Sequence, residues 1–155
     1  MEALKAILEC RIATELIVGD GSKLYKELYE SGLINETFET EIFNGHGYFA
    51  TIISGESNQW EKVKEKIDRE IERVKLDGFD ADEFEIIKKS MYGEQIRGFA
   101  SVSGVAEAML ATNFEGLSVY DETQVLSKIT PEDIMNRLSD FDINNTSVSI
   151  INPAK

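Results

Sequence analysis

Histidine and cysteine are nearly absent from the sequence, which contains one residue of each among 155. His46 alone cannot form the two-histidine zinc motifs H-E-x-x-H or H-x-x-E-H, and a single thiol cannot build a thiolate zinc site. A Ser-His-Asp triad would have to use His46 as its base, and the sequence has no G-x-S-x-G motif. These shortages argue against metal or triad catalysis that is complete within this chain.

Long hydrophobic runs and paired cysteines are also missing. Cys10 has no second cysteine with which to form a disulfide, and such a sequence suits a reducing compartment. The first residues include an early acid and no sustained apolar core, unlike a signal peptide. No apolar run approaches the roughly 18 residues that a membrane span needs. We therefore expect a cytoplasmic protein that makes no membrane contact.

Basic residues are too few to balance the acidic ones. Sixteen Lys and Arg residues stand against 29 Asp and Glu residues, which gives a formal net charge of −13. A field of that sign repels nucleic-acid phosphates, and no basic cluster reverses it locally. The charge therefore argues against nucleic acid as a partner.

The length and composition are those of one folded domain. Domains most often contain roughly 100–150 residues, and this chain has 155. Hydrophobic residues make up 42% of the sequence and charged residues 29%. This balance supports one hydrophobic core and excludes the disordered and membrane-spanning classes.

The first two expected elements are helices. Over residues 3–18 apolar side chains recur at helical spacing, and small ones extend the apolar surface around much of the helix, so it should be buried on several sides. Cys10 belongs to this set, which favours core packing over a reactive thiol. Ser22 is the expected N-cap of a second helix that ends at Gly32.

Two strands should follow, over residues 37–43 and 47–54. Asn44-Gly45 between two β-rich runs is a strong hairpin signal, because both residues tolerate a positive φ angle. His46 lies in this turn, where an exposed side chain is expected. The first strand alternates polar and apolar residues, so one of its faces should be wet. The second is apolar on both faces and should be more central in its sheet.

The rest of the chain predicts further helices and one late strand. Apolar residues from Trp60 to Val74 step by three and four, which indicates a helix over residues 58–77 that packs on a sheet. Asp80 and Thr130 are the expected N-caps of later helices. The remaining helices are expected over residues 80–97, 102–114, 119–126 and 131–138, and a strand over residues 146–151 before Pro153.

The order is helix, helix, strand, strand, several helices and a strand. Grouped helices and strands, without strict alternation, indicate an α+β fold with an antiparallel-type sheet packed by several helices. Three strands are too few to cover so many amphipathic faces, and the first helix has no strand leading into it. We therefore expect residues 1–155 to form a single α+β domain that is an incomplete lobe of a larger, multi-lobe protein.

Several short motifs follow one another in an order known from one enzyme family. Residues 21–34 read GSKLYKELYESGLI, a small-residue turn and then a helix with leucine, aromatic and glutamate positions before Gly-Leu. Next come the hairpin and the long helix from Trp60. They are followed by the helix start Asp80-Ala81-Asp82-Glu83-Phe84 and by the segment Ile129-Thr130-Pro131-Glu132-Asp133-Ile134. Over residues 21–153 the chain resembles the C-terminal, non-zinc lobe of the pitrilysin/insulinase-type zinc metallopeptidases, which include the mitochondrial processing peptidases.

The resemblance implies a function shared between two lobes. In this family two related α+β lobes close around a chamber, and one of them binds zinc through an H-x-x-E-H helix. The resemblance implies that this chain is a substrate-binding, chamber-closing region that is not catalytic alone and has no cofactor of its own. Zinc-bound water and a glutamate base on the partner lobe would hydrolyse the peptide. The implied partners are a peptide or protein substrate and the zinc-bearing lobe.

The resemblance also points to candidate substrate-binding residues. Active members often offer an arginine and a tyrosine near this helix and hairpin. Tyr29 stands at the arginine position, and Asn35 or Glu36 stands near the tyrosine position. Because neither position holds the residue that active members have there, no catalytic residue is carried over. Tyr29, Asn35 and His46 are the candidate contacts to substrate. The hairpin could offer an edge strand to an extended peptide, and the net charge would favour basic peptides or simply keep the protein in solution.

Two other functions fit the same sequence. One is a non-catalytic scaffold or dimerisation lobe of a degenerate family member, which would make a homo-oligomer possible. The other is an unrelated α+β sensor of a small molecule. Exposed tyrosines and a hydrophobic sheet edge favour the peptidase lobe or the scaffold, whereas a closed, polar-rimmed pocket in a complete sheet favours the sensor.

Overall fold

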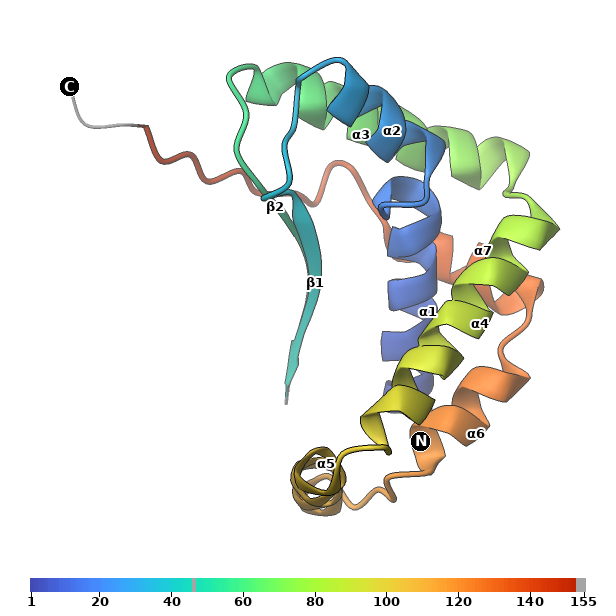
Figure 1. Cartoon of the computed structure of the whole chain (residues 1–155). Helices are drawn as coiled ribbons and strands as arrows, with labels where there is room; N and C mark the ends of the chain where they lie inside the picture. The colour runs from blue at the N-terminus through green and yellow to red at the C-terminus, as the bar shows by residue number, and fades with distance from the viewer. Residues whose placement is uncertain (46, 153–155) are drawn as a thin grey trace.

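The structure, a computed structural model, describes residues 1–45 and 47–152 and confirms an α+β fold (Figure 1). His46, one of the candidate contacts, lies outside the described residues. None of the described helices is both long enough and apolar enough to cross a membrane. The elements are α1 Glu2–Val18, α2 Lys23–Glu30, β1 Glu39–Gly45, β2 Tyr48–Ser54, α3 Trp60–Asp77, α4 Ala81–Gly98, α5 Val102–Phe114, α6 Asp121–Lys128, α7 Pro131–Arg137 and a 3-10 turn Leu138–Asp140.

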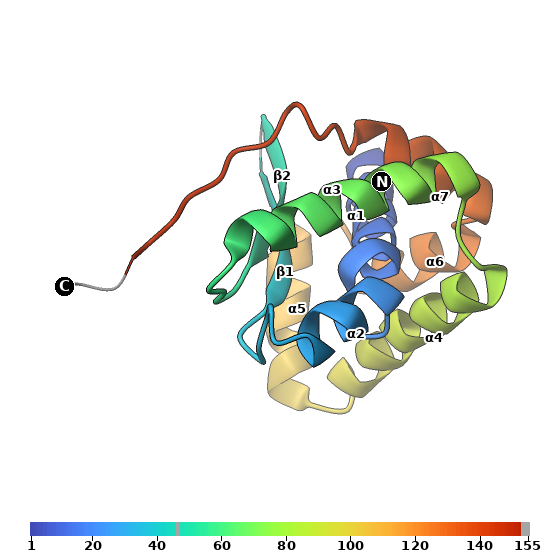
Figure 2. The ribbon, with the colours of Figure 1, turned by 90° about the horizontal axis from the view of Figure 1, so that it is seen from above.

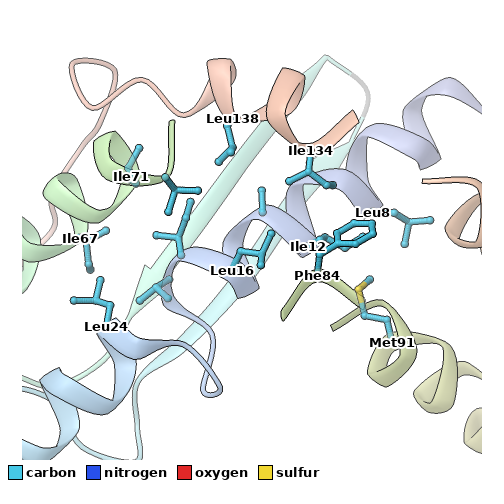
Figure 3. Packing of buried hydrophobic residues seen from close by; sticks show 14 of the residues in the cluster. Leu8, Ile12, Leu16, Leu24, Ile67, Ile71, Phe84, Met91, Ile134 and Leu138 are labelled. Carbon is cyan, nitrogen blue, oxygen red and sulfur yellow. The ribbon is translucent and has the colours of Figure 1, made fainter. Parts of the chain in front are cut away.

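Helix α1 is the centre of the fold. It contacts α2, α3, α4, α6, α7 and β1, and Figure 2 shows these helices gathered around it. Leu8, Ile12 and Ile17 are almost completely buried, and each such side chain contributes about 1.5–3 kcal/mol relative to an exposed one. Figure 3 shows Phe84 from α4 and Ile134 from α7 packed close to this helix. The burial of α1 on several sides follows the apolar pattern of its sequence.

Side-chain caps fix where several helices begin. The Ser22 Oγ atom accepts a hydrogen bond from the Tyr25 N–H at 3.0 Å, and the Asp80 Oδ1 atom accepts one from the Asp82 N–H at 2.7 Å. Thr130 and Asp133 form a reciprocal capping box at the start of α7. These bonds satisfy backbone donors that have no partner within the helix, so the predicted N-caps are confirmed.

The sheet consists of β1 and β2 as an antiparallel hairpin, with Glu39 opposite Ser54 and Gly45 opposite Tyr48. Neither strand has a second neighbour among the described residues. The predicted strand over residues 146–151 is wrong, because that segment has no regular secondary structure and pairs with no strand in the described part of the chain. A strand is held by hydrogen bonds to a neighbour, so an alternating sequence alone does not make one.

Helix α5 has the predicted boundaries but almost no packing partner. None of its residues is buried, and apolar side chains such as Met109, Leu110 and Phe114 are largely exposed. In Figure 1 it lies at one end of the molecule, away from α1. The apolar face expected from the sequence is therefore present, but no described element covers it.

Candidate functional site

An aromatic row links α2 to the start of the hairpin. Because Leu24 and Leu28 turn into the core, Tyr25 and Tyr29 share the outer side of α2 one turn apart. Their rings stack with centroids 6.0 Å apart, and Tyr25 meets Phe38 edge-on at 5.9 Å. Tyr29 is half exposed, so its ring can contact an apolar or aromatic side chain from outside.

Asn35 joins the two ends of the hairpin. Its Oδ1 atom accepts hydrogen bonds from the backbone N–H and the hydroxyl of Thr37 at 2.9 and 2.6 Å. Its Nδ2 atom donates to Glu56 at 3.0 Å, and the Glu56 N–H donates to the Thr37 hydroxyl at 3.2 Å. Asn35 thereby fastens the segment before β1 to the segment after β2. Its contact with substrate, like that of Tyr29 and His46, stays a prediction.

An acidic cleft of about 560 Å³ lies beside β1 and contacts α1, α2 and α4. Burial, followed by the nearby charge of Asp20, raises the pKa of the Glu15 carboxyl above its usual value. A cationic group placed there would relieve this repulsion. The charged residues that line the cleft are Arg11, Glu15, Asp20, Glu39, Glu83 and Glu94.

A larger hollow, which we call the trough, lies between strand β2 of the hairpin and the helices α1 and α3. It has a volume of about 1260 Å³. The trough is lined by the whole of β2, by one side of α1 with part of α3, and by residues of segment 141–149, which turns at residues 143–145. Sequence reasoning did not find it, although the apolar character of β2 on both faces was the signal. Apolar residues that line it include Ile7, Cys10, Phe49, Ile52, Trp60 and Val63.

The described residues offer no fitting set of zinc ligands. Within residues 1–45 and 47–152, no three His, Cys, Asp or Glu side chains meet in a way that could hold a metal ion. Cys10 is buried, and that burial raises the pKa of its thiol to about 11. Zinc binds the thiolate, so this thiol is a poor ligand at neutral pH.

Comparison with known proteins decides the family. The family model described as the Peptidase M16 inactive domain matches residues 4–91, which is more than half of the chain. The chain belongs to this family. The M16 inactive domain begins with the apolar α1 and extends through the hairpin and α3 into α4, so the family match includes the aromatic row, the Asn35 junction and most of the trough walls. The resemblance drawn from the sequence is confirmed.

The M16 domain also has longer relatives. It is 28% identical over 135 residues to the uncharacterized zinc protease YmfH of Bacillus subtilis (strain 168), across 87% of this chain and 31% of that protein. The crystal structure of an M16-like protein from Alicyclobacillus acidocaldarius matches 90% of this chain with a TM-score of 0.79 and 20% identity. A protease from Helicobacter pylori matches 88% with a TM-score of 0.72 and 18% identity. The chain spans about a third of each relative.

Proposed function

We propose that this chain is the substrate-binding, chamber-closing part of a zinc-dependent peptidase of the M16 type, and that it is not catalytic by itself. The match to the family's inactive domain carries this proposal. The described residues offer no ligand set for zinc, which fits a division of labour in which another lobe holds the metal. On that lobe, zinc supplies the activated water for peptide hydrolysis.

The free edge of β1 is the proposed seat of the substrate. An extended peptide that pairs with this edge would gain main-chain hydrogen bonds with little sequence preference. Glu39 and Glu41 lie on β1, and Glu39 also lines the acidic cleft. Basic side chains of the peptide would therefore meet negative charge. Tyr29 lies at the end of the aromatic row opposite Phe38, and its exposed ring would contact a side chain of the peptide.

Binding and chemistry can be tested separately on the purified chain. We expect it to bind a fluorescently labelled, lysine-rich nonapeptide more tightly than a glutamate-rich one at low salt, to cleave neither, and to contain no stoichiometric zinc. The measurements are fluorescence anisotropy, mass spectrometry of the peptides and elemental analysis. One tightly held zinc per chain, or cleavage of either peptide, would contradict the non-catalytic role. Equal affinity for both peptides would contradict the acidic binding site.

A scaffold or dimerisation lobe is the second candidate. Exposed tyrosines and an apolar sheet edge favour either the peptidase lobe or the scaffold. Tyr29 and Tyr48 are exposed tyrosines, and Phe49 and Ile52 are exposed apolar residues on β2. Binding of neither peptide at low salt, together with a stable homo-oligomer in light scattering, would favour the scaffold. The small-molecule sensor has less support, because the described sheet has two strands and its hollows lie beside it.

A further inference from the structure

The proposed peptide site is concentrated at the open end of the hairpin, the end away from the Asn44-Gly45 turn (Figure 1). Glu39 is the first residue of β1, and it lines the acidic cleft together with Thr40. Phe38 lies just before β1, lines the same cleft and meets the ring of Tyr25 edge-on. A loss of order at this open end would therefore disturb the edge of β1, the cleft and the aromatic row together.

Strand pairing alone does not secure the open end. A hairpin of two strands is marginally stable in water, and local opening begins where contacts are few. The last strand pair at this end joins Glu39 to Ser54, and the Ser54 hydroxyl donates a hydrogen bond to the Glu39 carboxylate at 3.2 Å. Within the described part of the chain, neither strand has another strand beside it. The order of the open end therefore depends on contacts outside the strand pairing.

Three side chains just beyond the last strand pair provide such contacts, and we call them the clasp: Asn35, Thr37 and Glu56. The Asn35 Oδ1 atom accepts hydrogen bonds from the N–H and the hydroxyl of Thr37, and its Nδ2 atom donates to the Glu56 carboxylate at 3.0 Å. The Glu56 N–H donates to the Thr37 hydroxyl at 3.2 Å. Each of the three residues is bonded to the other two, so the clasp is a closed network.

The clasp lies where the two segments approach each other most tightly. A Cβ atom at Gly55 would lie 3.0 Å from the Phe38 Cα atom, closer than the roughly 3.5–4.0 Å of an ordinary carbon contact. Gly55 and Phe38 are the chain neighbours of Glu56 and Thr37, so the clasp holds this close approach. Because the Phe38 ring packs on Tyr25, the backbone here also determines where the aromatic row lies.

We propose that Asn35 is a positioning residue for peptide binding, because the clasp that it completes keeps the open end of the hairpin paired. The edge of β1 and the aromatic row are then in place before a peptide binds, and binding is spared the entropy cost of ordering them. This inference rests on the proposed function, in which an extended peptide pairs with β1. The role is additional to any contact that Asn35 itself makes with the peptide.

Exchanging the donor and the acceptor tests the clasp at constant net charge. Asn35→Asp puts an oxygen where the amide nitrogen lay, 3.0 Å from the Glu56 carboxylate, so repulsion replaces the hydrogen bond. Asn35→Asp combined with Glu56→Gln restores a hydrogen bond in the opposite direction, because the amide then lies on residue 56. This double variant gains one negative charge and loses another, so it keeps the net charge of −13. Glu56→Gln alone is the control, since it removes a charge but keeps a hydrogen-bonding pair.

Hydrogen exchange of the hairpin and the affinity for peptide are the two measurements. We expect Asn35→Asp to speed the exchange of amides in residues 38–41 and 52–54 about 3- to 10-fold. Its affinity for the labelled lysine-rich nonapeptide should fall by a similar factor, although the added negative charge alone would raise that affinity. The double variant should recover both, and Glu56→Gln should keep the protection of the hairpin. Exchange in the helices should stay unchanged in every variant, because the clasp residues are exposed.

The two measurements separate this inference from the proposed function. Unchanged exchange and affinity in Asn35→Asp, or a double variant that recovers neither, would overturn the inference. Undiminished peptide binding by Asn35→Asp despite faster exchange would overturn the positioning role and leave the proposed function intact. A natural chain that binds neither the lysine-rich nor the glutamate-rich nonapeptide would contradict the proposed function, whereas the expected exchange pattern across the variants would still support the clasp.

Discussion

Arg137, the last residue of α7, donates two hydrogen bonds to the buried Glu9 of α1. Its Nε and Nη2 atoms lie 3.0 and 2.8 Å from the Glu9 Oε2 atom, and the side chain of Glu9 is only 6% exposed. The Lys5 ammonium lies 3.4 Å from the other carboxylate oxygen. Arg137 and Asp140 also line the trough. The ion pair between Arg137 and Glu9 therefore holds the end of α7, and with it this part of the trough wall, against α1.

Removing one partner of this pair should destabilise the fold. Arg137→Met leaves the Glu9 carboxylate buried with less compensation, and we expect the free energy of unfolding to fall by on the order of 3 kcal/mol. Glu9→Met combined with Arg137→Met should recover most of that loss, because no unpaired buried charge remains. Urea unfolding of the two single variants and the double variant provides the measurement. Additive losses in the double variant would show that the two residues do not act as a pair.

Stability should depend on the ionisation of Asp133 in acid. Hydrogen bonds from Lys5 and from Thr130 lower the pKa of the Asp133 carboxyl from its ordinary 3.8 to about 2. A carboxyl whose pKa is lower in the folded chain than in the unfolded chain stabilises the fold at pH values above its pKa in the unfolded chain. This contribution is lost as the pH falls from about 4 to 2. We expect the loss to be about 1 kcal/mol, since the group is partly solvated. Thermal unfolding at several pH values should show this extra slope in the natural chain, and Asp133→Asn should lack it.

The thiol of Cys10 should react slowly with thiol reagents. Burial raises its pKa to about 11, so few molecules carry a thiolate at pH 8. We expect labelling by an aromatic disulfide reagent to be roughly 100-fold slower in the native chain than in urea. Cys10 is the sole cysteine, so the labelling reports on one site. Rapid, stoichiometric labelling under native conditions would contradict the core-packing interpretation.

Charge on β1 should decide the preference for basic peptides. Glu39→Gln with Glu41→Gln removes two negative charges from the proposed binding edge. We expect the affinity for a lysine-rich nonapeptide to fall about 3- to 10-fold at low salt and the difference to shrink in 0.5 M salt, because ions screen such contacts. The control, Glu85→Gln with Glu132→Gln, changes the net charge equally at residues outside the cleft. An equal fall in the control would mean that net charge alone attracts the peptide.

The helices could be predicted from the sequence because their signals are local. Ser22, Asp80 and Thr130 cap the helices that the sequence assigns to them, and the apolar steps from Val63 to Val74 are buried as expected. The hairpin followed from Asn44-Gly45 between two β-rich runs. In each case the residues that determine the structure lie within a few positions of one another.

Features that depend on distant neighbours were not predictable. The alternation around Val148 predicted a strand, but pairing requires a second strand, and none of the described residues provides one. The aromatic row and the junction of Asn35 with Glu56 join segments that the sequence pattern alone does not bring together. The trough could be anticipated only as an excess of apolar surface on α1 and β2, without its shape or its depth.

The mass of the native polypeptide tests most directly the claim that this chain is one part of a longer peptidase. An antibody raised against residues 1–155 would be used on source cells under denaturing conditions. We predict a band several-fold heavier than the 17.4 kDa of this chain. A band at 17.4 kDa would contradict the account, because the zinc-bearing lobe would then have no place in the same polypeptide.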